Sequence, residues 1–216
     1  MKRNQSGFTL IEIAIVLVII GLLLGGVLKG QELINSAKVK NLASDFKNTS
    51  LFIYSYQDKY HALPGDDALA STHVTGAINA ASGVTLGDGK IDGTWNDFNT
   101  TTSESTLFWQ HVRLAGIAAG VTTPGVEGYT PRNTQGGVIG ITNQAQSPVG
   151  GLKGAYIICS AGIQGKFAKQ LDIMMDDGNS STGSMQATIE PVTPAVSAPA
   201  ATTVDDTSSY TVCQGV

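Results

Sequence analysis

The chain has 216 residues, of which only 14% are charged, against roughly 25% in an average soluble domain. A hydrophobic content of 42% excludes disorder over the full length. The formal net charge of −4, without any cluster of Lys and Arg, argues against a nucleic-acid-binding surface. Two cysteines are too few for a disulfide-dense scaffold or a four-cysteine zinc site.

The apolar residues concentrate near the N-terminus, in a run from Phe8 to Leu28 that contains one charge, Glu12. As a helix this run is about 32 Å long, which is enough to cross a hydrocarbon core of about 30 Å. Lys2 and Arg3 precede it without any acid. The positive-inside rule therefore predicts a cytoplasmic N-terminus and an exported chain after Leu28.

Two simpler interpretations fit this segment less well. A secretory signal peptide has a shorter apolar region and a cut site of small residues, whereas Leu28 is followed by KGQE. A plain membrane anchor accounts for length and orientation but leaves Glu12 unexplained, since an ionisable group inside a membrane costs a few kcal/mol and generally serves a function. For Glu12 alone, a tolerated glutamate near the interface is the alternative.

The string GFTLIE at residues 7–12, with its basic leader and the apolar run, resembles the prepilin processing motif of type IV pilins and type II secretion pseudopilins. The resemblance implies that a membrane-embedded prepilin peptidase cuts between Gly7 and Phe8 and then methylates the new amine of Phe8. Residues 1–7 would then be the leader peptide, and residues 8–28 the transmembrane and assembly helix.

Glu12 acquires a role in this interpretation. A carboxylate in a low-dielectric helix bundle is favourable only when it is paired. We expect Glu12 of one subunit to meet the Phe8 amine of the next subunit and so to fix the register of the filament. Many type IVa major pilins carry a proline in this helix, but here no proline occurs before Pro64, which predicts a straighter helix. Glycines could instead supply softness or close helix approach, and they stand at Gly21, Gly25, Gly26 and Gly30.

The helix is predicted to continue over residues 29–60, because no proline or glycine occurs between Glu32 and Lys59. Apolar or small residues recur there at helical spacing, which predicts an amphipathic helix covered by a globular head. The stripe consists of Leu33, Ala37, Leu42, Phe46, Ser50 and Ile53. A proline-glycine stop at Pro64 and Gly65 ends it near Tyr60.

Residues 61–216 are predicted to form this head, periplasmic at first and extracellular in a pilus. A short helix runs from an N-cap at Ser103 to a stop at Gly116, and a second helix covers 164–174. Strands are predicted at 138–142, 155–159, 185–189 and 210–213. The fold class is therefore α+β, a pilin fold with one long helix on a small antiparallel sheet. Residues 190–206 hold three prolines and no aromatic residue, which predicts an exposed, disordered-looking loop.

Cys159 and Cys213 both end predicted strands on the exported side of the membrane. In an oxidising compartment two cysteines are best interpreted as a disulfide, and many type IV pilins tie their C-terminal region in this way. Two free buried thiols are the alternative.

The sequence from Asp88 to Gly93 resembles part of a calcium loop, with Asp88 and Asp92 as metal ligands. Lys90 replaces an expected ligand, however, and the twelfth position of the window is Asn99 instead of glutamate. A plain hairpin turn accounts for the same Asp-Gly pairs. Calcium is therefore the only cofactor left open, and the acidic turn at 176–178 is a weaker candidate.

Enzyme signatures are missing from the sequence: no GxSxG, P-loop or dinucleotide motif occurs, and His61, His73 and His111 lack metal-ligand spacing. Trp95 and Trp109 are expected to pack in a core. The sequence therefore predicts a non-enzymatic protein.

The resemblance implies a structural subunit of a type IV pilus or pilin-like filament, anchored in the inner membrane before assembly. Its partners would be prepilin peptidase, further copies of itself, other pilins, and an inner-membrane platform with its ATPase. A type II secretion pseudopilin is the alternative, although pseudopilins usually lack a disulfide. A minor pilin or membrane-anchored adhesin module is a further alternative.

Overall fold

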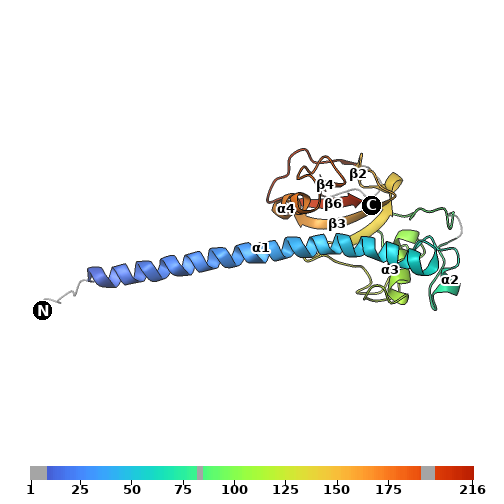
Figure 1. Cartoon of the computed structure of the whole chain (residues 1–216), viewed down its shortest axis with the longest axis horizontal. Helices are drawn as coiled ribbons and strands as arrows, with labels where there is room; N and C mark the ends of the chain where they lie inside the picture. The colour runs from blue at the N-terminus through green and yellow to red at the C-terminus, as the bar shows by residue number, and fades with distance from the viewer. Residues whose placement is uncertain (1–8, 82–84, 191–197) are drawn as a thin grey trace. The chain divides into compact units, whose positions relative to one another are not determined.

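The computed structural model describes residues 9–81, 85–190 and 198–216 (Figure 1). The chain divides into two compact units, Met1–Lys38 and Val39–Val216. Helix α1 (Leu10–Tyr60) contributes to both and is uninterrupted over 51 residues, as expected where no proline breaks the hydrogen-bond ladder. It ends where the sequence predicts, and His61 caps it with a left-handed backbone (φ 54°) while its N–H donates to the carbonyl of Gln57 over 2.8 Å.

The second unit builds a four-stranded antiparallel sheet in the order β1-β3-β6-β4, which confirms the predicted α+β class. A two-stranded parallel pair, β2 and β5, lies outside this sheet. The helices are α2 (Ala70–His73), α3 (Glu104–Leu114), the 3-10 turn η1 (Gln144–Gln146) and α4 (Gly165–Met175). The strands are β1 (Ile139–Asn143), β2 (Val149–Gly150), β3 (Tyr156–Gln164), β4 (Met185–Ile189), β5 (Ala198–Pro199) and β6 (Ser209–Gly215).

Strand β3 at the centre of the sheet is buried on both faces, and alternate residues serve different cores. Ile158 packs in the main core with the buried residues of α1, α3 and α4, whereas Ile157 and Cys159 pack in a smaller core around Trp95. The sheet therefore separates a helix-covered face from a face covered by loops.

The distal part of α1 is the central helix of the second unit. Its buried residues recur at helical spacing and are Val39, Leu42, Ala43, Phe46, Thr49, Ile53 and Tyr56. The predicted stripe is confirmed at Leu42, Phe46 and Ile53, and Ser50 is half-buried. The prediction is wrong at Leu33 and Ala37, which are exposed. Both residues lie before Val39, the first buried residue of the helix.

The predicted elements match the main ones, and strand β4 has the predicted bounds. Ser103 caps α3 by accepting a hydrogen bond from the Thr106 N–H, and Gly116 after the helix adopts φ 75°. The predicted loop at 190–206 needs a correction: residues 191–197 lie outside the described residues, but β5 pairs with β2 within this range. Ala201 N–H also donates to the Ala187 carbonyl, so main-chain pairing orders the described part.

Candidate functional site

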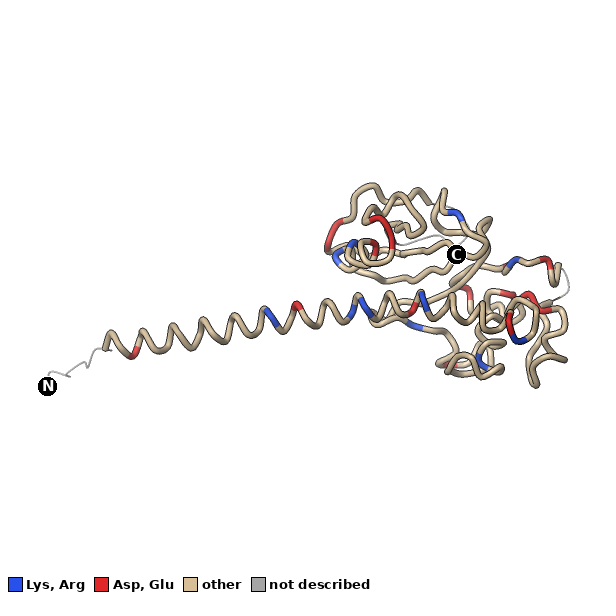
Figure 2. The backbone as a smooth tube through the Cα atoms, in the orientation of Figure 1, with Lys and Arg blue, Asp and Glu red and all other residues tan. Residues whose placement is uncertain are grey.

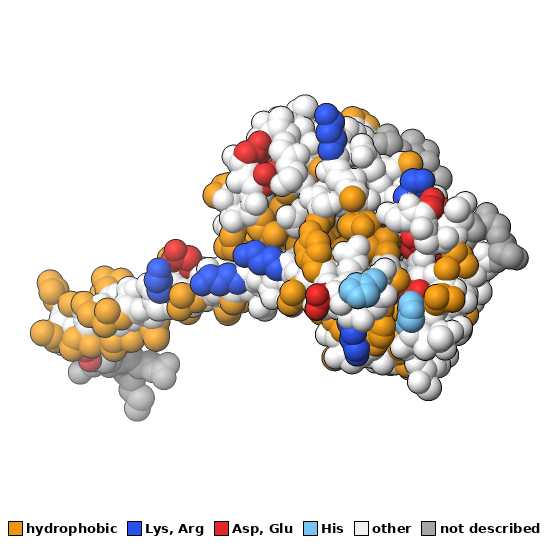
Figure 3. Space-filling model, turned by 45° about the vertical axis from the view of Figure 1, so that its right-hand side comes forward, with side chains coloured by type: hydrophobic (Ala, Val, Ile, Leu, Met, Phe, Trp, Pro, Cys, Tyr) orange, Lys and Arg blue, Asp and Glu red, His pale blue; other side chains and the backbone are white. Residues whose placement is uncertain are grey.

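The N-terminal half of α1 presents an apolar surface that nothing within its own unit covers. All its residues from Leu10 to Leu28 are exposed, and exposures of large apolar side chains range from 88% at Leu10 to 46% at Ile20. Figure 2 shows this stretch nearly free of charged residues, and Figure 3 shows hydrophobic side chains crowding it. Among the described residues, α1 is the one helix long and apolar enough to cross a membrane, with a mean hydropathy of 2.8 over its best window. Water alone is an unfavourable environment for such a surface, which suggests membrane anchoring.

Glu12 lies in the first turn of α1 and is bound to Thr9. The Thr9 backbone N–H and hydroxyl donate to Glu12 Oε2 over 2.8 and 2.7 Å, and the Glu12 N–H donates to Thr9 Oγ1 over 3.3 Å. This reciprocal arrangement is a capping box. The spacing Thr-x-x-Glu in the sequence carries this signal, so Thr9 could have been recognised as a second functional position beside Glu12.

Four glycines on this part of the helix leave positions on its surface without a side chain. A Cβ built at Gly21, Gly25, Gly26 or Gly30 would meet no atom within 4 Å. The helix continues through all four glycines without interruption. Small residues of this kind let another helix approach closely, which is how helices associate inside membranes.

The processing positions Gly7 and Phe8 lie outside the described residues. Residues 2–28 match the family model described as the prokaryotic N-terminal methylation motif. The chain carries a prepilin-type N-terminus. This motif and the long helix on a small antiparallel sheet support the superfamily of type IV pilins and pseudopilins. No curated protein and no solved structure matches the chain.

The prepilin motif belongs to structural proteins. Trp95 and Trp109 are buried, as a packing role predicts. His111 is also buried: its Nδ1 accepts from the Gly65 N–H over 3.0 Å, so its Nε2 donates to the Ile78 carbonyl over 2.8 Å. Burial lowers the pKa of His111, and both ring nitrogens are engaged in holding the turn after α1.

The two cysteines face each other on neighbouring strands. Cys159 of β3 pairs with Cys213 of β6 in the antiparallel register, and the two form a disulfide with a Cα–Cα distance of 4.1 Å. This is the pairing expected from the sequence, and it fastens the C-terminal strand to the centre of the sheet. Both residues are fully buried in the smaller core with Trp95.

The calcium candidates in the loop before α3 have different partners. Asp88 is held by Lys90, whose backbone N–H and Nζ each lie 3.0 Å from one of its carboxylate oxygens. The side-chain hydrogen bond from Lys90 lowers the pKa of Asp88. Asp92 instead accepts a hydrogen bond from Asn143 on β1. An EF-hand-like arrangement centred on Asp88 therefore has a lysine where a cation would lie.

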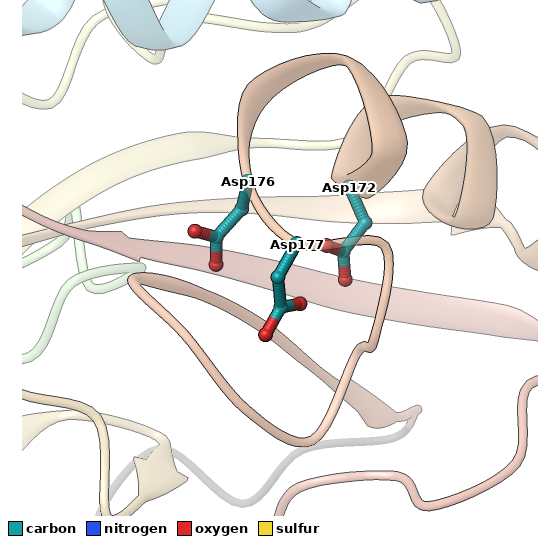
Figure 4. Close-up of side chains that lie close together, drawn as sticks. All are labelled: Asp172, Asp176 and Asp177. Carbon is teal, nitrogen blue, oxygen red and sulfur yellow. The ribbon is translucent and has the colours of Figure 1, made fainter.

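A second acidic group follows α4, where oxygens of Asp172, Asp176 and Asp177 lie within 4.8 Å of one another (Figure 4). Each carboxylate already accepts hydrogen bonds from the turn or from the start of β4: Asp172 from Gly178 N–H over 2.9 Å, and Asp176 from Met185 N–H over 2.8 Å. Asp177 accepts from the Asn179 N–H and the Thr182 hydroxyl. These bonds account for the cluster as a turn that joins α4 to β4.

Proposed function

We propose that this protein is a structural subunit of a type IV pilus or pilin-like filament. Prepilin peptidase would cleave it after Gly7 and methylate Phe8. The mature chain would then polymerise through the N-terminal half of α1. The observation that carries this proposal is an exposed apolar stretch of α1, from Leu10 to Leu28, that begins inside a prepilin motif and contains a single acid, Glu12.

The driving force for assembly is burial of this apolar surface against helices of other subunits instead of lipid. Between helices in a membrane the gain comes from van der Waals packing and polar contacts. The glycines at 21, 25, 26 and 30 favour such packing, because without Cβ atoms at these positions the backbone of a neighbouring helix can come close. The same surface anchors the precursor in the membrane before assembly.

Glu12 supplies specificity to this packing. Cleavage exposes the amine of Phe8, which stays cationic after methylation. Both hydrogen bonds from Thr9 reach Oε2 of Glu12, and Oε1 takes part in neither, so the carboxylate can serve its own helix and the amine of a neighbour together. A buried charge pair is favourable only when both partners meet, and it therefore selects one register.

The cellular location of the protein follows from the orientation of its N-terminal helix in the membrane. Lys2 and Arg3 keep the N-terminus cytoplasmic, and the head lies on the exported side, where the Cys159–Cys213 disulfide is stable. An inner-membrane platform with its ATPase would drive extraction of the subunit into the filament, alongside copies of itself and other pilins.

The test compares Glu12→Ala with Glu32→Ala in the source bacterium. Glu32 is the matched control, because it lies on the same helix just beyond the apolar stretch and already pairs with Lys29 of its own helix over 2.7 Å. We expect both variants to lose the leader peptide and only Glu12→Ala to be missing from sheared filaments. Normal filament yield from Glu12→Ala would contradict the proposal.

Two measurements distinguish a pilus from a secretion pseudopilus: the amount of the protein in sheared surface material, and the effect of deleting its gene. An abundant band near 22 kDa in the sheared fraction indicates a major pilin. Loss of exoprotein secretion on gene deletion, without loss of surface filaments, indicates a pseudopilin.

A further inference from the structure

A groove of about 460 Å³ lies between α1 and the end of α4, and β6 borders it at Gln214. Half-exposed apolar side chains line this α1–α4 groove. Leu51 and Tyr54 of α1 are 58% and 55% exposed, and Met174 of α4 is 46% exposed. Large apolar side chains that adjoin one another on an exposed surface mark a site of interaction.

The groove also carries a positive charge. Lys47 lies on its border and is exposed. Within the part of the chain that the structure describes, Lys47 forms no ion pair, whereas Lys29, Lys90 and Lys169 each pair with an acid. A segment that fits this groove should therefore combine an apolar side chain with a carboxylate.

The turn over residues 124–128 presents this combination. Its residues from Gly125 to Gly128 are all exposed, and Val126, at 46% exposure, stands next to Glu127. Both glycines adopt φ 80°, a left-handed conformation that lets the chain reverse tightly here. Glu127 forms no ion pair among the residues described, so its carboxylate is available to a partner.

The buried Tyr129 holds this turn in place from below. Its N–H donates to the Val126 carbonyl over 3.1 Å, and its hydroxyl donates to the Thr106 carbonyl of α3. Its own carbonyl accepts from Nη1 of Arg113, also on α3, over 2.7 Å. The tip of the turn is therefore ordered before it meets a partner, which lowers the entropic cost of binding.

The groove and the turn lie on different sides of α1. Phe52 packs edge-on against Trp109 of α3, with ring centroids 6.5 Å apart. Phe52 follows Lys47 by five positions, so the two side chains point about 140° apart around the helix axis. The turn belongs to the side of α3, because Tyr129 is bonded to two residues of that helix. In Figure 1, α4 and the yellow-green segment after α3 likewise lie on opposite sides of α1.

We propose that the α1–α4 groove binds the 124–128 turn of a second copy of this chain. Val126 packs on Leu51 and Met174, and Glu127 pairs with Lys47. Because the groove and the turn face different ways, one copy can use both at once, and such a heterologous contact repeats from copy to copy without closing. The inference rests on the proposed function, since it places the contact between the heads of neighbouring subunits in one filament.

The first test exchanges the charges of Lys47 and Glu127. Lys47→Glu and Glu127→Lys each bring two like charges together, and we expect each to lower the yield of sheared filaments by about tenfold. The double variant restores an opposite pair and should recover most of the yield. Lys153→Glu is the matched control, because Lys153 is an exposed lysine of the head outside the groove, and it should leave the yield unchanged.

All these side chains are exposed, so the variants should melt at the temperature of the parent. A double variant with no recovery of filaments, or a loss in Lys153→Glu equal to that in Lys47→Glu, would overturn the contact.

The second test joins the two surfaces directly. Both native cysteines are engaged in their own disulfide, so the double variant Leu51→Cys with Val126→Cys places one new thiol on each surface. Mild oxidation of its filaments should give a ladder of dimers and larger multimers on a non-reducing gel, and neither single variant should give multimers beyond a dimer. Filaments without a ladder would overturn this contact and leave the proposed function standing, whereas a parent that forms no filaments would overturn both.

Discussion

The backbone nitrogen of Thr9 lies 2.8 Å from Glu12 Oε2, and the Glu12 N–H returns a bond to Thr9 Oγ1, so the acid in the apolar helix is oriented by the residue three positions before it. The free N–H groups of a helix start have no partner within the helix, and inside a membrane they have no water either. The same carboxylate is therefore placed to stabilise its own helix and to meet a neighbour.

Replacing Thr9 should separate these two roles. Thr9→Val keeps the shape of the side chain but removes the hydroxyl, whereas Thr9→Ser retains it. We expect faster amide exchange over the first turn of α1 in Thr9→Val, measured by NMR in micelles, and a lower yield of filaments. Thr9→Ser should behave as the parent; equal exchange in all three proteins would show that the capping box contributes nothing.

The disulfide should dominate the stability of the head. Cys159 and Cys213 are 54 residues apart, and the chain-entropy model gives about 4 kcal/mol for a loop of this length. The double variant Cys159→Ala with Cys213→Ala should lose free energy of unfolding on this scale, measured by urea denaturation in detergent. A loss below about 1 kcal/mol would contradict this role.

Two neighbouring apolar residues of α1 should differ sharply in their effect on stability. Ile53 is 0% exposed in the main core, and Leu51 is 58% exposed. Ile53→Ala should lower the free energy of unfolding by about 2–5 kcal/mol, because it removes buried contacts and leaves a cavity. Leu51→Ala should change it by less than about 0.5 kcal/mol. Tryptophan fluorescence during urea unfolding reports both, and similar losses would contradict the placement of the core.

Stability should fall in acid because of His111. Burial holds its pKa below the ordinary value, so the unfolded chain takes up a proton near pH 6.5 that the folded chain refuses. The contribution of His111 is therefore fully present above about pH 6.5 and decreases as the pH falls toward its folded-state pKa.

The check is His111→Gln, whose amide can accept from the Gly65 N–H and donate to the Ile78 carbonyl as the ring does. The loss of stability between pH 7.5 and pH 5 should be smaller in this variant than in the parent. Parallel pH profiles would show that His111 does not titrate in this way.

Much of the fold follows from local signals. The α1 helix, the Ser103 cap and the strands each depend on residues that are close in sequence. Their patterns can therefore be recognised without knowledge of the tertiary structure. The pair β2–β5 could not be predicted in this way, because Ala198 meets Val149 only after the sheet has brought remote segments together. Leu33 and Ala37 were misplaced for a related reason: helical spacing gives a face, but it does not tell where the head begins to cover that face.

Some residues of interest could likewise be recognised from the sequence, whereas others required the structure. Glu12 stands out in the sequence because a charge in an apolar run is costly. Glu104 does not stand out, since a glutamate after a serine is an ordinary helix start, and only the structure shows that it is fully buried and accepts a hydrogen bond from the Asp92 N–H. A pattern of adjacent residues pointed to Asp88, which the structure pairs with Lys90 instead.

The most direct test of the account is the mass of the N-terminal peptide of the protein isolated from its bacterium. Cleavage after Gly7 and methylation predict a first residue of N-methylphenylalanine at position 8. A mature protein that still begins at Met1, or that begins at an unmethylated residue other than Phe8, would contradict the central claim.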